Sequence, residues 1–256
     1  MNHVRSVLIW AAIAILILTW LPLLAIRRIF DRDPGLYSTG RLFRNLGTAI
    51  SRVNPNWHIT IQGAEDIDDR NPYIVVSNHV SNADIPLISN LPWEMKWIAK
   101  KELFDTPVIG WMMSMAGDIP VARGKLRQRV LVFKKSRYYL SKNISVMFFP
   151  EGTRSRSGKM NRFNTGAFDL AIREGLPILP LVIDGTRDCL PKKSWVFSHR
   201  ADVRLEVLQP IPTDRYKKSE SNELTQEVRS VMLHKLAEMR NVPVEEVDAM
   251  ASAARR

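Results

Sequence analysis

The pattern of apolar and polar residues separates a strongly apolar N-terminal segment from a longer segment with strand and helix periodicity. Residues 7–26 (VLIWAAIAILILTWLPLLAI) contain no charged side chain. A helix of this length, rising ~1.5 Å per residue, extends roughly 30 Å and reaches across the hydrocarbon core of a bilayer. A cleaved signal peptide is the alternative. Against it, the apolar run is long, and small residues are missing before Arg27.

A second N-terminal segment, residues 38–54, has apolar residues at helical spacing with arginines beside them. This pattern predicts a basic amphipathic helix that lies on a membrane or packs on the domain as an ordinary surface helix. The two segments predict either one spanning helix followed by an amphipathic one or a hairpin that enters a single leaflet. More arginines follow the apolar run than precede it, which places the rest of the chain on the cytoplasmic face.

From Trp57 onward, short β-branched or alternating runs alternate with helical patterns. The predicted strands are residues 57–62, 73–77, 96–99, 119–121, 145–149, 178–183 and 203–208. The predicted helices are residues 84–89, 108–116, 128–142, 166–174 and 223–239. This order predicts an α/β fold with a mixed, largely parallel sheet flanked by helices. The strand at 203–208 alternates apolar and polar residues, as an edge or antiparallel strand does, and the tail to Arg256 is expected to fray.

These patterns divide the chain into three parts. Residues 1–56 are expected to form membrane-anchoring helices, and residues 57–215 an α/β domain. Residues 216–256 form a C-terminal helix and tail that belong to the same domain or pack on it.

Charge and cysteine content limit the partners. The formal net charge is +11, which favours an anionic partner, either nucleic acid or an acidic membrane surface. The apolar N-terminal segment and the lack of any nucleic-acid-binding motif favour anionic membrane lipid over nucleic acid. Cys189 is the single cysteine and no two of the five histidines stand at metal-ligand spacing, so we expect no structural zinc.

The strongest local motif is Ser77–Asp84 (SNHVSNAD), which follows a predicted buried strand. His79 stands just after that strand, and Asp84 stands five residues later, where the next helix should begin. A turn between them would bring the carboxylate to one imidazole nitrogen and leave the other facing a substrate hydroxyl. The alternative is a local cap or a buried histidine with satisfied hydrogen bonds. The sequence has no convincing serine or cysteine nucleophile, so the pair would activate a substrate alcohol.

Three further segments carry candidate binding residues. Glu151, Gly152, Thr153 and Arg154 follow a predicted buried strand, where glycine permits close backbone approach and arginine suits phosphate oxygens. The alternative is a solvated basic loop. Lys100 and Arg123 lie near the two ends of residues 100–124. Both could reach an anion, although each alone would also fit a surface charge. Residues 177–182 belong to an apolar strand that is framed by two prolines and ends at Asp184-Gly185.

In this order, the four segments resemble the glycerolipid acyltransferase superfamily, and specifically the 1-acyl-sn-glycerol-3-phosphate acyltransferases. His79–Asp84 matches the His-x4-Asp block, and Glu151–Arg154 matches the Glu-Gly-Thr-Arg block residue for residue. Lys100, Gly117 and Arg123 match the second block, and Pro177–Val182 the fourth. The second block usually ends in Asp-Arg, whereas this chain has Ala122-Arg123, which leaves the acceptor detail open.

The resemblance implies an O-acyltransferase that moves an acyl chain from acyl-coenzyme A or acyl carrier protein to the hydroxyl of a lysophosphatidic acid-type acceptor. It implies that His79 is the general base, that Asp84 orients it, and that Lys100, Arg123 and residues 151–154 bind the acceptor phosphate. No cofactor or metal is implied. A related enzyme acting on another lysophospholipid or an amino-acid lipid, and a catalytically inactive lipid-binding protein, are the alternatives.

Overall fold

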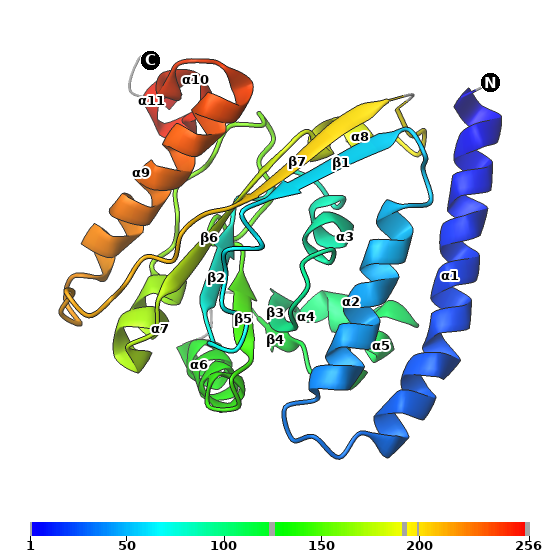
Figure 1. The fold of residues 1–256 in the computed structure, drawn as a ribbon, viewed down its shortest axis with the longest axis horizontal. Helices are drawn as coiled ribbons and strands as arrows, with labels where there is room; N and C mark the ends of the chain where they lie inside the picture. The colour runs from blue at the N-terminus through cyan, green and yellow to red at the C-terminus, as the bar shows by residue number, and fades with distance from the viewer. Residues whose placement is uncertain (1, 123–125, 191–193, 199, 254–256) are drawn as a thin grey trace.

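A seven-stranded sheet forms the centre of the computed structural model, which describes residues 2–122, 126–190, 194–198 and 200–253 (Figure 1). The strands are β1 (Trp57–Gln62), β2 (Ile74–Ser77), β3 (Met95–Lys100), β4 (Ile119–Val121), β5 (Ser145–Phe148), β6 (Ile178–Asp184) and β7 (Ala201–Val207). Their spatial order is β1-β7-β6-β2-β5-β3-β4, and only β6 and β7 pair antiparallel. The predicted mixed, largely parallel sheet is therefore confirmed, with β7 inside the sheet and β1 at its edge.

Helices cover both faces of the sheet, which explains why the central strand β2 is a continuous apolar run. Ile74 and Val76 pack against one group of helices, namely α6 (Leu126–Leu140), α7 (Gly166–Glu174) and α9 (Ser221–Arg240). Val75 points to the other face, where α3 (Asp84–Ile88) packs. The two cores hold β2 rigidly in the middle of the sheet, so the residues that follow its carboxyl end start from a fixed position.

The two N-terminal helices, α1 (Asn2–Phe30) and α2 (Tyr37–Ser51), run side by side along one flank of the molecule (Figure 1). One face of α1 packs on the protein: Ile9 and Ile13 contact Phe197, and Leu24 lies against Met112 of α5 (Ile109–Met115). Its opposite face exposes large apolar side chains, including Val4, Val7, Leu8, Ile15, Leu18, Leu23, Ile26, Ile29 and Phe30. By length and composition, His3–Phe30 could cross a membrane.

A buried cluster of four charged residues joins α2 to the sheet. Lys96 Nζ lies 3.0 Å from Glu94 Oε1 and donates to the carbonyl oxygens of Leu36 and Ala116, each at 2.9 Å. Arg44 of α2 pairs with Asp118, and the Oδ1 atom of Asp118 also accepts from the Trp97 backbone at 3.0 Å. The hairpin of α1 and α2 is therefore fixed to β3 by buried charges as well as by apolar packing.

The predicted elements of the α/β domain agree with the observed bounds to within two residues. Four short helices were not predicted: α4 (Lys101–Phe104), α8 (Thr186–Cys189), α10 (Val244–Val247) and α11 (Ala249–Ala253). The expected fraying of the C-terminal tail is wrong for residues 244–253. This segment is held by burial of Val247, which is 1% exposed, and by the ion pair of Asp248 with Arg229.

Candidate active site

The His79 and Asp84 side chains meet at the carboxyl end of β2. The chain leaves the strand at Asn78, whose side-chain amide exchanges two 2.8 Å hydrogen bonds with the backbone of Ile183 in β6. This pairing continues the contact between the two strands and fixes the point where the turn begins. The turn then brings His79 Nδ1 to 2.7 Å from Asp84 Oδ2.

The Asp84 carboxylate is fully buried, and both of its oxygens accept hydrogen bonds. Besides His79, Oδ2 accepts from the backbone N–H groups of Val80 at 2.8 Å and Ser81 at 3.0 Å. The Thr186 hydroxyl, at the start of α8, donates to Oδ1. These donors satisfy a buried carboxylate in its ionised form and hold it in one orientation.

The tautomer of His79 follows from this geometry. An ionised carboxylate only accepts, so Nδ1 carries the proton, and in the neutral imidazole Nε2 then has the lone pair. Among the described residues, none forms a hydrogen bond with Nε2, and the side chain is 16% exposed. The arrangement therefore presents a basic nitrogen to a molecule arriving from outside.

Aromatic packing and the loop after β5 hold the histidine from other directions. The Phe149 ring stacks on the imidazole with centroids 4.0 Å apart and planes at 20°, and Trp97 and Phe149 form a T-shaped pair. The backbone N–H of His79 donates to Glu151 Oε1 at 2.8 Å, and its carbonyl accepts from Ser155 N at 2.8 Å. The His79 turn and the Glu-Gly-Thr-Arg loop therefore form one connected unit.

Glu151 is buried and its carboxylate is used inside the protein. Its Oε2 accepts from the backbone N–H of Asn161 at 3.0 Å and from the Asn161 amide at 2.7 Å. Burial raises the pKa of the Glu151 carboxyl, and the hydrogen bonds from His79 and Asn161 lower it in part. The position of Glu151 fits a residue that supports the His79 turn rather than one that faces a substrate.

The other predicted binding residues lie at different depths. Gly152, Thr153 and Arg154 are exposed on the loop after β5, where Gly152 has φ +67°. Lys100 is exposed at the carboxyl end of β3, at the same edge of the sheet as the loop after β5. Gly117 is buried after α5 with φ +79° and lies under the Tyr139 hydroxyl, away from this edge. Arg123 lies outside the described residues.

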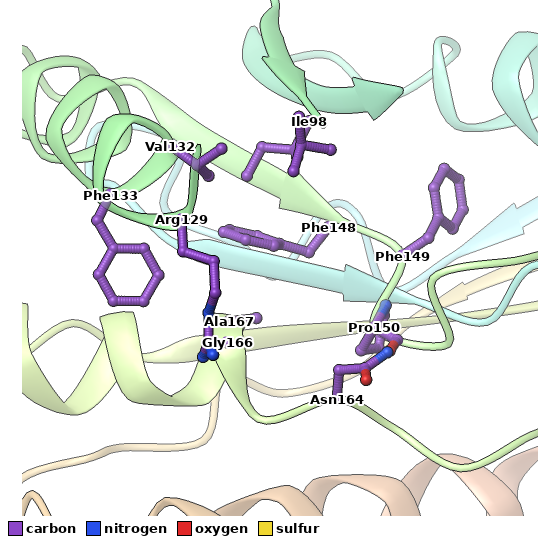
Figure 2. A pocket seen from close by; sticks show the side chains of 11 residues that line it. Ile98, Arg129, Val132, Phe133, Phe148, Phe149, Pro150, Asn164, Gly166 and Ala167 are labelled. Atoms are coloured by element: carbon purple, nitrogen blue, oxygen red, sulfur yellow. The ribbon is translucent and has the colours of Figure 1, made fainter. Parts of the chain in front are cut away.

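A pocket of about 160 Å³ lies between β3, β5, α6 and α7, and its lining includes Phe149 and Pro150, which follow β5 (Figure 2). Its wall is mostly apolar, with Arg129 and Asn164 as polar members. Figure 2 shows the Phe148 ring pointing into the pocket and the Phe149 ring pointing away from it, as adjacent strand residues do. The strand end that separates the two rings therefore places an apolar pocket on one side and His79 on the other.

Sequence reasoning gave no role to Asn78, Thr186, Asn161 or Phe149, although all four shape the surroundings of His79 and Asp84. Asn78 lies inside the Ser77–Asp84 motif and Thr186 follows the proline-framed strand, so their polar side chains beside buried strands were a usable signal. Asn161 and Phe149 had none, because their contacts depend on how separate loops meet. Among the described residues, no group of three or more His, Cys, Asp or Glu side chains could hold a metal ion.

Comparisons with known proteins agree with this architecture. Residues 58–184 match the family model described as Acyltransferase. The chain is 36% identical over 180 residues to a chloroplastic 1-acyl-sn-glycerol-3-phosphate acyltransferase of Arabidopsis thaliana, covering 70% of this chain and 50% of that protein. It is 33% identical over 177 residues to 1-acyl-sn-glycerol-3-phosphate acyltransferase alpha of Homo sapiens, covering 68% of this chain and 62% of that protein.

A third similar protein has a solved structure. The fold matches the crystal structure of the 1-acyl-sn-glycerophosphate (LPA) acyltransferase PlsC from Thermotoga maritima with a TM-score of 0.77. Sequence identity is 24%, and the match covers 93% of this chain and 96% of that chain, so this comparison supports the fold. The chain spans about half the length of the first plant relatives that it matches. The protein belongs to the acyltransferase family, as the four sequence blocks predicted.

Proposed function

We propose that this protein transfers an acyl chain from an acyl thioester to the hydroxyl of a lysophosphatidic acid-type acceptor at a membrane surface. The observation that carries the proposal is the 2.7 Å contact between His79 Nδ1 and Asp84 Oδ2, which leaves Nε2 open toward the outside. The relatives named as 1-acyl-sn-glycerol-3-phosphate acyltransferases support the choice of acceptor.

In the proposed reaction, His79 Nε2 takes the proton from the acceptor hydroxyl as the oxygen attacks the thioester carbonyl. The resulting tetrahedral intermediate collapses, the carbon–sulfur bond breaks, and the thiolate of the coenzyme A or acyl carrier protein leaves. The imidazolium returns its proton to that thiolate. Asp84 stays ionised throughout, fixes the tautomer and stabilises the imidazolium, with Thr186 and two backbone N–H groups holding it in place.

Arg154 is proposed to bind the acceptor phosphate, with Lys100 and Arg123 adding positive charge. Arg154 is exposed on the loop whose next residue, Ser155, donates to the His79 carbonyl. A phosphate held there would place the acceptor near the base. Guanidinium groups match phosphate oxygens in pairs, which fixes direction as well as position. Glu151 takes a supporting role in this account, because both of its carboxylate oxygens bind protein groups.

We also propose that α1 and α2 enter one leaflet as a hairpin rather than crossing the bilayer. The face of α1 from Arg5 to Leu24 contacts the protein: Arg5 donates to the Ser198 carbonyl at 2.8 Å, and Leu24 is completely buried. A helix attached to the α/β domain along this length could span a bilayer only by taking the domain into it. Both ends of α1 would then lie on the same, cytoplasmic, side.

Two experiments test these proposals. Purified protein in detergent should be offered lysophosphatidic acid and lysophospholipids with larger head groups, each with acyl-coenzyme A and with acyl carrier protein donors. The proposal predicts ester formation with lysophosphatidic acid, and preference for another acceptor, or no product at all, would contradict it. For topology, single cysteines replacing His3 and Asp33 should both react with a membrane-impermeant maleimide from the same side of sealed vesicles. Labelling from opposite sides would show a spanning helix.

A further inference from the structure

The C-terminal helix α9 reaches the loop that follows the Glu-Gly-Thr-Arg block through the side chain of Arg229. This side chain is buried, at 5% exposed, and its guanidinium binds two successive carbonyl groups. Nε donates to the Asn161 carbonyl and Nη2 to the Met160 carbonyl, both at 2.9 Å. Nη2 also lies 2.6 Å from Asp248 Oδ1. The fork of an arginine can bind three acceptors in fixed directions, whereas a lysine offers a single point charge.

The C-terminal segment adds a second connection to the same loop. The backbone N–H of Met160 donates to the Val247 carbonyl at 2.7 Å, and the Met160 carbonyl accepts from Ala249 N at 3.2 Å. The Met160 side chain is 1% exposed and belongs to the main core. Residues 160 and 161 are therefore fixed from the C-terminal side of the molecule, beyond the segment 58–184 that matches the family model.

Asn161 passes this restraint to the histidine. Its backbone N–H and its amide both donate to Glu151 Oε2, and Glu151 Oε1 accepts from the backbone N–H of His79 at 2.8 Å. Three steps thus lead from Arg229 to the backbone of the proposed base. Each step is a hydrogen bond to a buried or half-buried group, where water does not compete strongly.

We propose that Arg229 is a positioning residue for acyl transfer, acting on His79 through Asn161 and Glu151. The inference rests on the proposed function. Its physical basis is that a base must lie within hydrogen-bond reach of the proton it removes, and a displacement of about 1 Å can cost ~10²-fold in rate. The C-terminal helix α9 then helps to position the active site instead of only completing the fold.

Kinetics of single and double variants test the proposal. Arg229→Lys keeps the charge beside Asp248 but loses the fork, and Asn161→Ala removes the amide that binds Glu151. Each should lower kcat about tenfold while changing KM for the acceptor less than threefold. The double variant should lose little more than either single one, because both changes break the same connection. Additive losses, or a normal kcat in folded Arg229→Lys, would overturn the proposal.

Arg44→Lys is the matched control. Arg44 is equally buried, at 4% exposed, and also pairs with carboxylates, but it lies between α2 and β3. We expect it to lower the thermal unfolding temperature without lowering the kcat of the folded protein. A kcat loss equal to that of Arg229→Lys would show that any buried arginine has this effect. If Arg229→Lys does not fold, Asn161→Ala alone must show the kcat loss, and a normal kcat there contradicts the connection.

A readout without catalysis separates this inference from the proposed function. The ¹⁵N imidazole signals of His79, assigned with a His79→Gln variant, should shift in Arg229→Lys and remain unchanged in Arg44→Lys. If the wild-type protein acylates no acceptor, the proposed function fails while these signals still test the connection. Unchanged His79 signals in Arg229→Lys would contradict it.

Discussion

The Thr186 hydroxyl donates a hydrogen bond to Asp84 Oδ1, the carboxylate oxygen that does not contact His79. Thr186 begins α8, 102 residues after Asp84 in sequence, and its side chain is completely buried. Thr186, just after the carboxyl end of β6, thus helps to hold Asp84 in the orientation that pairs with His79. The orientation of the carboxylate therefore depends in part on a residue that binds the oxygen not used by the histidine.

Replacing Thr186 with valine keeps the shape of the side chain and removes this donor. A hydrogen bond to a charged group is worth ~1.5–3 kcal/mol, so we expect kcat to fall about 10- to 100-fold with little change in KM. Steady-state rates with varied acceptor measure both quantities. Thr213→Val is the control, since Thr213 is equally buried but binds backbone carbonyls near Leu176. Equal kcat losses in the two variants would remove Thr186 from the mechanism.

Arg154→Ala should mainly weaken acceptor binding. Loss of charge-assisted hydrogen bonds to phosphate should raise KM for lysophosphatidic acid about 10- to 100-fold. An uncharged monoacylglycerol acceptor should respond much less. Arg173→Ala provides the control, because Arg173 is also exposed but lies near the end of α7. An unchanged KM for the phosphate-bearing acceptor would count against the assigned role.

Lys96→Met should destabilise the protein because it leaves Glu94 buried without its nearest cation. Breaking a buried ion pair by removing one partner costs ~3–5 kcal/mol. The thermal unfolding temperature, followed by circular dichroism in detergent, should fall by roughly 10 °C. Glu94→Gln combined with Lys96→Met should recover part of the loss. Arg70→Ala, which breaks an exposed pair with Asp68, should leave the temperature unchanged. Similar temperatures for all variants would contradict the importance of the cluster.

Cys189 should resist thiol reagents in the folded protein. Burial raises the pKa of its thiol to about 12, and the negative charge of Asp84 acts in the same direction. The thiolate is the reactive form, so labelling by Ellman's reagent at pH 8 should be much slower in the folded than in the unfolded protein. Because the folded pKa is raised, the thiol favours folding fully below about pH 9, and this contribution is lost as the pH rises toward 12. Rapid labelling of folded protein at pH 8 would contradict this environment.

The sequence predicted the sheet well because β2, β5 and β6 are continuous apolar runs, which are typical of buried strands. The flanking helices were predicted from apolar residues at helical spacing. The spacing of His79 and Asp84 allowed a contact between them without deciding it, and the resemblance to the four acyltransferase blocks made that contact the favoured interpretation. The roles of Thr186 and Asn161 could not be read in this way, since their partners are distant in sequence. Lys96 and Glu94 were given no role from the sequence, and they are buried at a place where α2, β3 and the end of α5 meet.

The C-terminal tail shows the same limit. Residues 244–253 lack a strong apolar period, so local pattern predicted fraying. Their order comes from tertiary contacts, chiefly burial of Val247 and the bonds of residues 247–249 with Met160 and Arg229. Such long-range contacts override weak local preference, which is why the error fell on this segment.

The rate of acyl transfer by His79→Ala decides whether His79 Nε2 is the general base. General-base assistance is typically worth ~10²–10⁴-fold, so kcat should fall by at least about a hundredfold while the thermal unfolding temperature stays near the wild-type value. His234→Ala, which changes an exposed histidine on α9, should keep full activity. Near-normal turnover of lysophosphatidic acid by folded His79→Ala would show that His79 is not the general base.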